Sequence, residues 1–177
     1  MRLFIPDADA TLALGKALGQ ALARSACATE GCATGGCGAG GPVPLLLAGP
    51  LGSGKTTLVR GLVSALPGAD EAEVSSPSFN IVNLYPTRPQ VAHFDLYRCA
   101  GQTPDEFLDA LDAKDVLVVA EWAELLPAKD LPEEALQLLW SPVPSGRALE
   151  IRAWGKAAGG LLDALAPMFK QWRSALT

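Results

Sequence analysis

The chain has 177 residues and a formal net charge of −5 at pH 7. This length suffices for one α/β domain with a hydrophobic core and is short for two, so we expect a single domain over residues 1–177. The acidic balance argues against strong direct binding to nucleic acid, because such binding needs a basic surface that replaces counterions. No apolar stretch has membrane-spanning length and the N-terminus does not resemble a signal peptide, so we expect a cytoplasmic protein that engages no membrane.

The first predicted elements are a short strand at residues 3–5 and a helix that begins after Asp7, a residue type suited to the N-cap position. Leucines recur along one face of this helix at Leu14, Leu18 and Leu22. The stretch 25–42 offers few side chains that could enter a core, so we predict an inserted surface loop there.

Three of the four cysteines lie at or within this stretch, at five-residue spacing: Cys27, Cys32 and Cys37. Zinc sites usually use closer cysteine pairs with further ligands nearby, and the one histidine, His93, is distant in sequence. Thiols in the cytosol are normally reduced, which disfavours disulfides. We therefore predict a flexible loop without a metal or redox site, and its role stays open.

The sequence GPLGSGKTT at residues 49–57 fits the pattern G-x-x-x-x-G-K-[ST]. An apolar run at 43–48 before it predicts a buried strand, and the pattern of 57–66 after it predicts a helix. A glycine-rich loop between them turns backbone N–H groups inward at a helix N-terminus, where the helix dipole favours anions. The sequence therefore predicts a site for a nucleoside triphosphate.

Two side chains of this glycine-rich loop have predicted chemical roles. Lys55 is placed to reach the β- and γ-phosphates, and the hydroxyl of Thr56 to ligate Mg²⁺. The predicted nucleotide-binding positions are Gly49, Leu51, Gly52, Ser53, Gly54, Lys55, Thr56 and Thr57. A glycine-rich turn without a ligand is the competing interpretation, and it leaves the GKTT sequence unexplained.

The later elements alternate between strand and helix patterns. We predict strands at 79–85, 90–97, 116–120, 135–140 and 148–154, a short helix from Pro104, and a C-terminal helix over 156–176 that Pro167 kinks or interrupts. The apolar run 116–120 suits a sheet buried on both faces. The expected fold class is α/β, a P-loop NTPase-like three-layer fold with a central, mostly parallel sheet flanked by helices.

An NTPase also needs a carboxylate near Mg²⁺ and a group that positions the attacking water. Glu121 follows the strand 116–120, and Asp95 ends the more mixed run 91–94. We assign Glu121 to the metal and Asp95 to the water or the γ-phosphate, although the roles could be exchanged. A solvated strand-end acid or a helix cap is the alternative interpretation of each. With Lys55, these two carboxylates form the predicted catalytic set.

Weaker signals surround this set. The switch-like segment, residues 75–78 with Ser76, Pro77 and Ser78, follows the predicted loop helix, where segments that sense a γ-phosphate often lie, although Ser-Pro clusters are mostly simple turns. His93 is two residues from Asp95 and so shares its face of the strand, where a hydrogen bond within the site is the plain interpretation. Trp122 and Arg147 are candidates for contact with adenine.

The order GPLGSGKTT, SPSFNIVNLY, HFDLYR and VLVVAEW resembles the TsaE (YjeE) family, the small ATPases of bacterial threonylcarbamoyladenosine synthesis on tRNA. The resemblance runs from the first helix to the last strands. It matches the family's aspartate of DLYR to Asp95, its glutamate of EW to Glu121, and its SPTF segment to residues 76–79. Ser78 stands where the family has threonine, and Ala123 stands where it usually has proline.

The resemblance implies that the protein binds ATP and Mg²⁺ at residues 49–57 and hydrolyses ATP slowly. It implies association with a TsaB–TsaD heterodimer, in which TsaD transfers the threonylcarbamoyl group from threonylcarbamoyl-AMP to the adenosine beside the anticodon. Contact with tRNA would then pass through these partners. The oligomeric state of the protein alone stays open.

Two other functions compete with this one. A P-loop small-molecule kinase usually closes an arginine-bearing lid over the phosphates, and no arginine cluster follows the central strands. An ATP-dependent regulatory switch would use the nucleotide state to choose partners. A GTP-dependent version is disfavoured, because the sequence contains neither N-K-x-D nor D-x-x-G.

Overall fold

The computed structural model describes residues 1–27, 41–99 and 101–173. Its strands are β1 (Arg2–Ile5), β2 (Leu45–Ala48), β3 (Val82–Tyr85), β4 (Gln90–Asp95), β5 (Val116–Glu121), β6 (Ala135–Pro142) and β7 (Arg147–Trp154). Its α-helices are α1 (Ala8–Cys27), α2 (Lys55–Val63), α3 (Asp105–Asp112) and α4 (Lys156–Leu165). Short 3-10 turns connect several of these elements, among them Tyr97–Cys99 and Ala123–Leu125.

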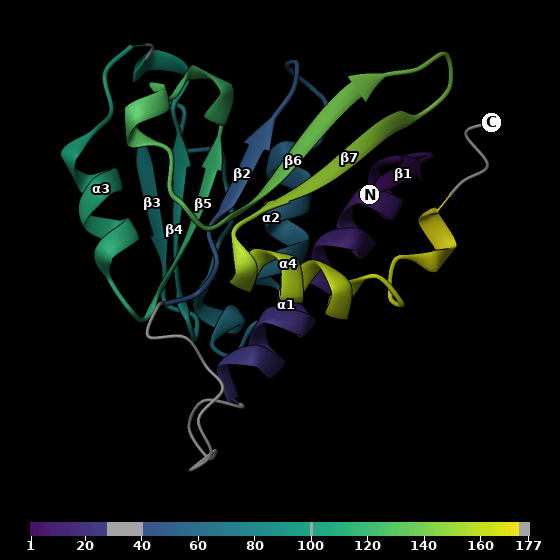
Figure 1. The fold of residues 1–177 in the computed structure, drawn as a ribbon, viewed down its shortest axis with the longest axis horizontal. Helices are drawn as coiled ribbons and strands as arrows, with labels where there is room; N and C mark the ends of the chain where they lie inside the picture. Colours follow the sequence, from purple (N-terminus) through teal and green to yellow (C-terminus); the bar gives the residue numbers. More distant parts are fainter. Residues whose placement is uncertain (28–40, 100, 174–177) are drawn as a thin grey trace.

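The strands form one seven-stranded sheet in the order β1-β7-β6-β2-β5-β4-β3 (Figure 1). The central strands β6, β2, β5 and β4 are parallel to one another. Towards the edges, β7 and β3 run antiparallel to their neighbours, as β1 does to β7. The predicted α/β class with a mostly parallel central sheet flanked by helices is confirmed.

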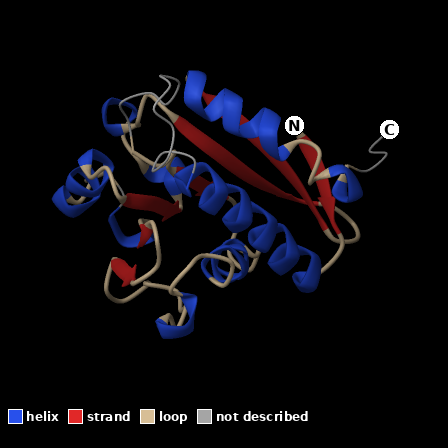
Figure 2. Cartoon of the chain, turned by 90° about the horizontal axis from the view of Figure 1, so that it is seen from below, coloured by secondary structure: helices blue, strands red, loops and turns tan. Residues whose placement is uncertain are grey.

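Alternate residues of the central strands enter different hydrophobic cores. On β2, Leu45 and Leu47 pack in the core that contains α1, α2 and α4, whereas Leu46 packs in the core of α3. In the latter, the ring of Phe107 meets Phe94 edge-on, with centroids 5.3 Å apart. Figure 2 shows α1 as a long helix alongside the strands. Burial on both faces explains the continuous apolar runs of β2 and of residues 116–120 in β5.

Glycines allow α1 and α2 to approach each other at backbone distance. A Cβ added at Gly15 of α1 would overlap the carbonyl oxygen of Leu58, and a Cβ at Gly61 of α2 would overlap that of Leu12. The helix α1 begins where the sequence indicated, because the Asp7 carboxylate accepts a hydrogen bond from the Ala10 N–H at 2.8 Å. The first helix is thereby fixed against the helix that follows residues 49–57.

Two predicted strands are shorter than expected. The strand predicted over 79–85 begins only at Val82, because the N–H groups of Asn80 and Ile81 both donate to the Pro77 carbonyl and Ile81 adopts φ 67°. The strand predicted over 90–97 ends at Asp95, whose carboxylate accepts a hydrogen bond from the Tyr97 N–H at 3.1 Å and turns the chain.

Several boundaries also differ from prediction. The strand predicted from residue 43 begins at Leu45, since Pro44 has no N–H for the ladder. The helix α2 ends at Val63, after which the chain tightens into 3-10-type bonds before Pro67. The helix α1 continues to Cys27, so the loop does not begin at residue 25; no proline or glycine interrupts those residues.

The C-terminal prediction is confirmed in part: α4 ends at Leu165, ahead of the interrupting Pro167. Cys32 and Cys37 lie outside the described residues. Within the described ranges, no helix combines the length and the apolar character needed to cross a membrane.

The close helix contact predicts that Gly61→Ala destabilises the fold. The added methyl group would meet backbone atoms that have no rotamer to change, which costs about 1–3 kcal/mol as in overpacked cores. The matched control is Gly159→Ala in α4, where nothing lies within 4 Å of the new Cβ. This control should gain about 0.5–1 kcal/mol from helix propensity. Urea unfolding of both variants measures the difference, and equal stability changes would contradict the packing described.

Glu134 predicts a pH-dependent contribution to stability. Its carboxylate accepts hydrogen bonds from the Lys156 and Ala158 N–H groups at the start of α4, and these backbone bonds, foremost that of Ala158, hold its pKa below the usual 4.5. A carboxyl with a lowered folded-state pKa stabilises the fold fully above its unfolded pKa, and this stabilisation is lost as the pH falls through the folded value. Glu134→Gln should therefore cost more stability at pH 7 than at pH 3.

The exposed neighbour Glu133 provides the control for this comparison. Glu133→Gln should change the unfolding free energy little at either pH. If Glu134→Gln lowers the unfolding free energy by the same amount at pH 7 and at pH 3, the charge of the carboxylate does not contribute to stability.

Candidate nucleotide-binding site

The glycine-rich loop joins β2 to α2 and has the backbone shape that its glycines permit (Figure 1). Gly49, Gly52 and Gly54 have φ values of 148°, 73° and 107°. At Gly49 a Cβ would lie 2.7 Å from the Cβ of Trp140, so a larger residue does not fit. Gly54 is the N-cap of α2 and has no side chain that could bond the first N–H groups of the helix. These groups and the helix dipole form a favourable environment for an anion.

Lys55 is almost fully buried at the first position of α2, with 4% of its surface exposed. Its Nζ donates hydrogen bonds to the carbonyls of Gly49 at 2.7 Å and Pro50 at 3.1 Å. The same atom lies 3.9 Å from the centre of the Trp122 ring, a cation–π contact. Burial lowers the pKa of Lys55, while the nearby carboxylates, foremost Glu121, oppose this shift.

Glu121 connects three elements of the fold. Its Oε1 accepts a hydrogen bond from the Thr56 hydroxyl at 2.7 Å and lies 2.9 Å from Nε2 of His93. Only 3% of Glu121 and none of His93 is exposed. The strand register explains the convergence, because Glu121 pairs with Asp95 of β4 on one side and with Leu47 of β2 on the other. Both carboxylates predicted from strand ends therefore lie next to each other beside the loop.

Asp95 contacts the switch-like segment. Its Oδ2 accepts a hydrogen bond from the Ser76 hydroxyl at 3.3 Å, and the Ser76 and Ser78 hydroxyls are 2.8 Å apart. Asp95 is 6% exposed, and Pro77 is buried between the two serines. The structure thus brings Ser76 to one carboxylate, with Ser78 bonded to Ser76, and brings Thr56 of the loop to the other carboxylate.

The remaining predicted residues have other neighbours. Leu51 projects from the loop with 90% of its surface exposed. Arg147 approaches the carbonyl of Gly52 at 3.5 Å. Trp122 packs instead against Lys55 and Tyr97, whose ring centre is 4.9 Å from its own. The two adenine candidates therefore do not contact the same part of the loop.

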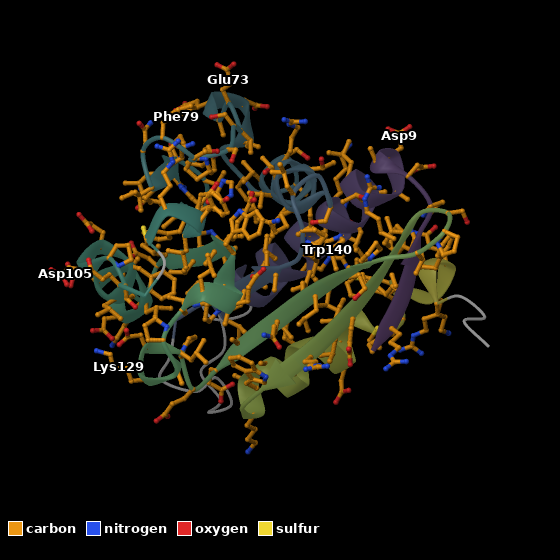
Figure 3. The ribbon with its side chains drawn as sticks, turned by 90° about the horizontal axis from the view of Figure 1, so that it is seen from above. Asp9, Glu73, Phe79, Asp105, Lys129 and Trp140 are labelled. Atoms are coloured by element: carbon orange, nitrogen blue, oxygen red, sulfur yellow. The ribbon has the colours of Figure 1, made fainter. Side chains whose placement is uncertain are left out.

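A hollow of about 190 Å³ lies on the Arg147 side of the loop. It is lined by loop residues and by β6 and the turn before β7, including Pro50, Ser53, Trp140 and Arg147. Among the described residues, the buried side-chain polar atoms without a hydrogen-bond partner are Ser53 Oγ and Trp140 Nε1. Both residues line this hollow. Figure 3 shows Trp140 near the middle of the molecule and Phe79 at its periphery.

The sequence did not reveal three residues of this site. Glu124 accepts a hydrogen bond from the Gly49 N–H at 3.2 Å, the hydroxyl of Tyr85 lies 3.3 Å from His93, and Trp140 packs under Gly49. Glu124 reaches the loop because Trp122 turns the chain with φ 62° directly after β5. No periodic pattern signals a turn of this kind. The prediction that His93 shares the site face with Asp95 is consistent with its contact to Glu121.

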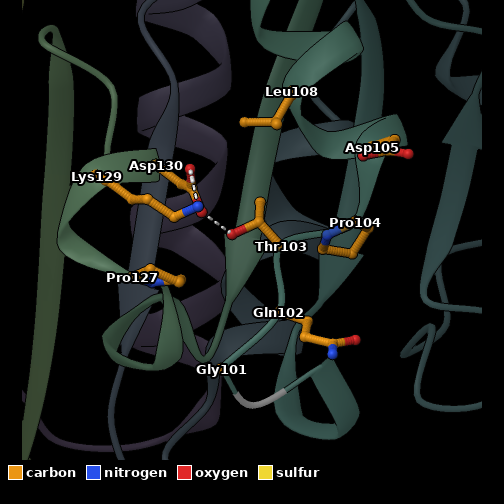
Figure 4. Close-up of a pocket in the computed structure, with 9 residues that line it drawn as sticks. All are labelled: Gly101, Gln102, Thr103, Pro104, Asp105, Leu108, Pro127, Lys129 and Asp130. Atoms are coloured by element: carbon orange, nitrogen blue, oxygen red, sulfur yellow. Dashed lines mark hydrogen bonds and ion pairs between the residues drawn. The ribbon is translucent and has the colours of Figure 1, made fainter.

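A second hollow, of about 560 Å³, is separate from this site (Figure 4). It lies between the turn before α3 and the 3-10 turn Ala128–Asp130. The Thr103 hydroxyl donates to Asp130 at 2.6 Å across it, and Lys129 pairs with the same carboxyl group at 4.0 Å. None of the predicted site residues lines this hollow.

The oxygen atoms at the loop suit a hard cation. Thr56, Glu121 and Asp95 supply hydroxyl and carboxylate oxygens, the donors that Mg²⁺ prefers. In the part of the chain that the structure describes, no three histidine, cysteine or acidic side chains are grouped to hold a metal by themselves. Mg²⁺ sites of nucleotide enzymes likewise have few protein ligands, and phosphate oxygens and water supply the others.

Comparison with known proteins identifies the family. The model of the family "Threonylcarbamoyl adenosine biosynthesis protein TsaE" matches residues 5–148. A protein of Mycobacterium tuberculosis named tRNA threonylcarbamoyladenosine biosynthesis protein TsaE is 30% identical over 165 residues, which cover 86% of each chain. Its namesake in Haemophilus influenzae is 31% identical over 135 residues, covering 72% of this chain and 77% of the relative.

A solved structure agrees with the fold. The crystal structure of Bacillus subtilis YdiB superposes with a TM-score of 0.67 over 95% of both chains, at 22% sequence identity. The match to the family model and to the named relatives confirms the resemblance drawn from the sequence motifs. The chain belongs to the TsaE family and shares its role in tRNA threonylcarbamoyladenosine biosynthesis.

Proposed function

We propose that this protein is a Mg²⁺-dependent ATPase that binds a TsaB–TsaD complex in the cytoplasm and supports threonylcarbamoyl transfer to the adenosine next to the tRNA anticodon. The observation that carries the ATPase proposal is the 2.7 Å contact between the Thr56 hydroxyl and the Glu121 carboxylate. It joins a helix N-terminus suited to phosphates with a strand-end carboxylate suited to a metal, next to the buried cation Lys55.

The triphosphate would lie in the glycine-rich loop. The N–H groups at the start of α2 would bind its oxygens, and the Lys55 ammonium would exchange the carbonyls of Gly49 and Pro50 for the β- and γ-phosphates. The nucleotide-binding set is Gly49, Leu51, Gly52, Ser53, Gly54, Lys55, Thr56 and Thr57. The hollow beside Ser53 and Arg147 would receive the nucleoside end, because it adjoins the loop directly.

Thr56 and Glu121 would hold Mg²⁺ together with phosphate oxygens, and the cation when bound would neutralise charge that develops on the phosphoryl group. Asp95, beside Glu121 in the sheet, would orient the attacking water or the γ-phosphate. The contact of Thr56 with Glu121 favours this division of roles over the reverse. The contact of Ser76 with Asp95 supports the proposal that the switch-like segment, with Ser76, Pro77 and Ser78, responds to the γ-phosphate.

The partner proposal rests on family membership and on charge. With a net charge of −5, the protein is poorly suited to hold tRNA by itself, so tRNA would be bound through TsaB–TsaD. The contact between Asp95 and the switch-like segment also suits an ATP-dependent regulatory switch, in which hydrolysis resets the complex.

Replacement of the carboxylates tests the catalytic assignment. Asp95→Asn and Glu121→Gln keep side-chain size and remove charge, so each should lower the rate of ATP hydrolysis by about 10²-fold or more. ATP binding, measured by calorimetry, should change far less. Chelation of Mg²⁺ should abolish turnover of the unaltered protein. The exposed α3 residues Glu106 and Asp109 give the controls Glu106→Gln and Asp109→Asn, and unchanged turnover in both site variants would refute the assignment.

Reconstitution tests the pathway role. The protein is combined with TsaB–TsaD, threonylcarbamoyl-AMP and unmodified tRNA, and ATP turnover is followed together with tRNA modification. We expect repeated rounds of modification only when the protein and hydrolysable ATP are both present. ATP consumption without effect on modification would reject this role. ADP formation that depends on an added small acceptor would instead indicate a kinase.

A further inference from the structure

A buried row of polar side chains connects the switch-like segment to Glu121. The Tyr85 hydroxyl on β3 lies 3.1 Å from the Ser75 carbonyl oxygen and 3.3 Å from Nδ1 of His93. Nε2 of His93 on β4 lies 2.9 Å from Oε1 of Glu121 on β5. Tyr85 is 4% exposed and His93 is fully buried. The row therefore crosses three adjacent strands and is buried from Tyr85 to Glu121, whereas its other end, Ser75, is exposed.

The chemistry of each group sets the direction of these hydrogen bonds. An ionised carboxylate only accepts, so Nε2 of His93 must carry a proton to bond Glu121. In the neutral ring, Nδ1 is then an acceptor that faces the Tyr85 hydroxyl. Burial raises the pKa of Tyr85, so this hydroxyl keeps its proton at neutral pH. That single proton has two acceptors within reach, the Ser75 carbonyl and the imidazole of His93.

The other end of the row is the contact proposed to hold the metal. Oε1 of Glu121 is shared by the His93 ring and the Thr56 hydroxyl, which approach from different elements. With two donors on one oxygen, the carboxylate has its orientation fixed before any ligand arrives. Asn83, which donates to the Ser75 carbonyl at 3.3 Å, ties the switch-like end of the row to the edge strand.

We propose that His93 and Tyr85 are positioning residues, which hold the Glu121 carboxylate against Thr56 and couple its orientation to the backbone of the switch-like segment at Ser75. This inference rests on the proposed ATPase function, because it assigns the row a role in orienting Glu121 for ATP hydrolysis. When the segment moves, the Tyr85 proton exchanges one acceptor for the other, and the hydrogen bonding of His93 changes with it. A histidine that merely fills the core would contribute to stability and not to the orientation of Glu121.

The imidazole itself supplies the first test, because His93 is the one histidine of the chain. In ¹⁵N-labelled full-length protein, its ring nitrogens give one set of signals that reports which nitrogen bears the proton. We expect a proton on Nε2, and a change of the Nδ1 signal in Tyr85→Phe, which removes only the hydroxyl. A proton on Nδ1 alone would overturn the proposal, since Nε2 could then not donate to Glu121.

Kinetics of matched variants supply the second test. His93→Leu removes both ring nitrogens, and it should lower kcat for ATP hydrolysis by about tenfold or more while the Kd for ATP stays within about threefold. His93→Gln places an amide donor near the position of Nε2 and should restore most of the rate. Tyr85→Phe should lower kcat less than His93→Leu does. The orientation of Glu121 matters to turnover more than to nucleotide binding, which explains the expected split.

Val91→Ala is the control, because Val91 is a fully buried residue of the same strand outside the row. It should lower the melting temperature and leave kcat within about twofold. Unchanged kcat in folded His93→Leu, or an equal drop in Val91→Ala, would overturn the proposal. If the unaltered protein hydrolyses no ATP, the proposed function fails, and the His93 spectrum still decides whether the row donates to Glu121.

Discussion

A carboxylate buried at the end of β5 organises this molecule. Glu121 is 3% exposed, and a buried charge is tolerated only where hydrogen bonds and opposite charge replace the lost water. Its hydrogen-bond donors are Thr56 of α2 and His93 of β4, and its charge interacts with the ammonium of Lys55. These groups meet because β5 lies between β2 and β4 in register. The order of the parallel strands therefore determines the chemistry at their ends.

Helix α1 packs against the glycine-rich loop. Gly15 and Gly61 let α1 approach α2 closely, and this brings Thr11 of α1 to the loop, where its methyl carbon lies 3.2 Å from the position of a Cβ on Gly54. Thr11 is fully buried and its hydroxyl donates to the Asp7 carbonyl, so it has little freedom to move. The loop is thus confined by packing on this side and open towards solvent at Leu51. A change in helix packing would be transmitted to the loop backbone.

Local patterns predicted those parts of the site that local chemistry determines. The loop needs its glycines in sequence, and the carboxylates Asp95 and Glu121 end predicted strands, so the sequence alone predicts both. The sequence does not predict the turn before Val82, because Phe79 and Ile81 are residue types that favour strands. The turn forms because backbone N–H groups donate to the Pro77 carbonyl and Ile81 adopts a left-handed backbone conformation. Glu124 bonds Gly49 from 75 residues away, and only the folded sheet brings them together. Contacts of this kind depend on strand order, which hydrophobic periodicity does not encode.

The charges around Lys55 bear on how the proposed substrate enters. Glu121, Glu124 and Asp95 all act on the Lys55 ammonium, so a polyphosphate that arrived alone would meet these three carboxylates beside it. This repulsion opposes the attraction that the Lys55 ammonium and the N–H groups at the start of α2 exert on phosphate. A divalent cation bound to the phosphates reverses the balance, because the carboxylates then attract the incoming complex. The same acidic groups would therefore favour the proposed Mg²⁺ complex over the bare nucleotide.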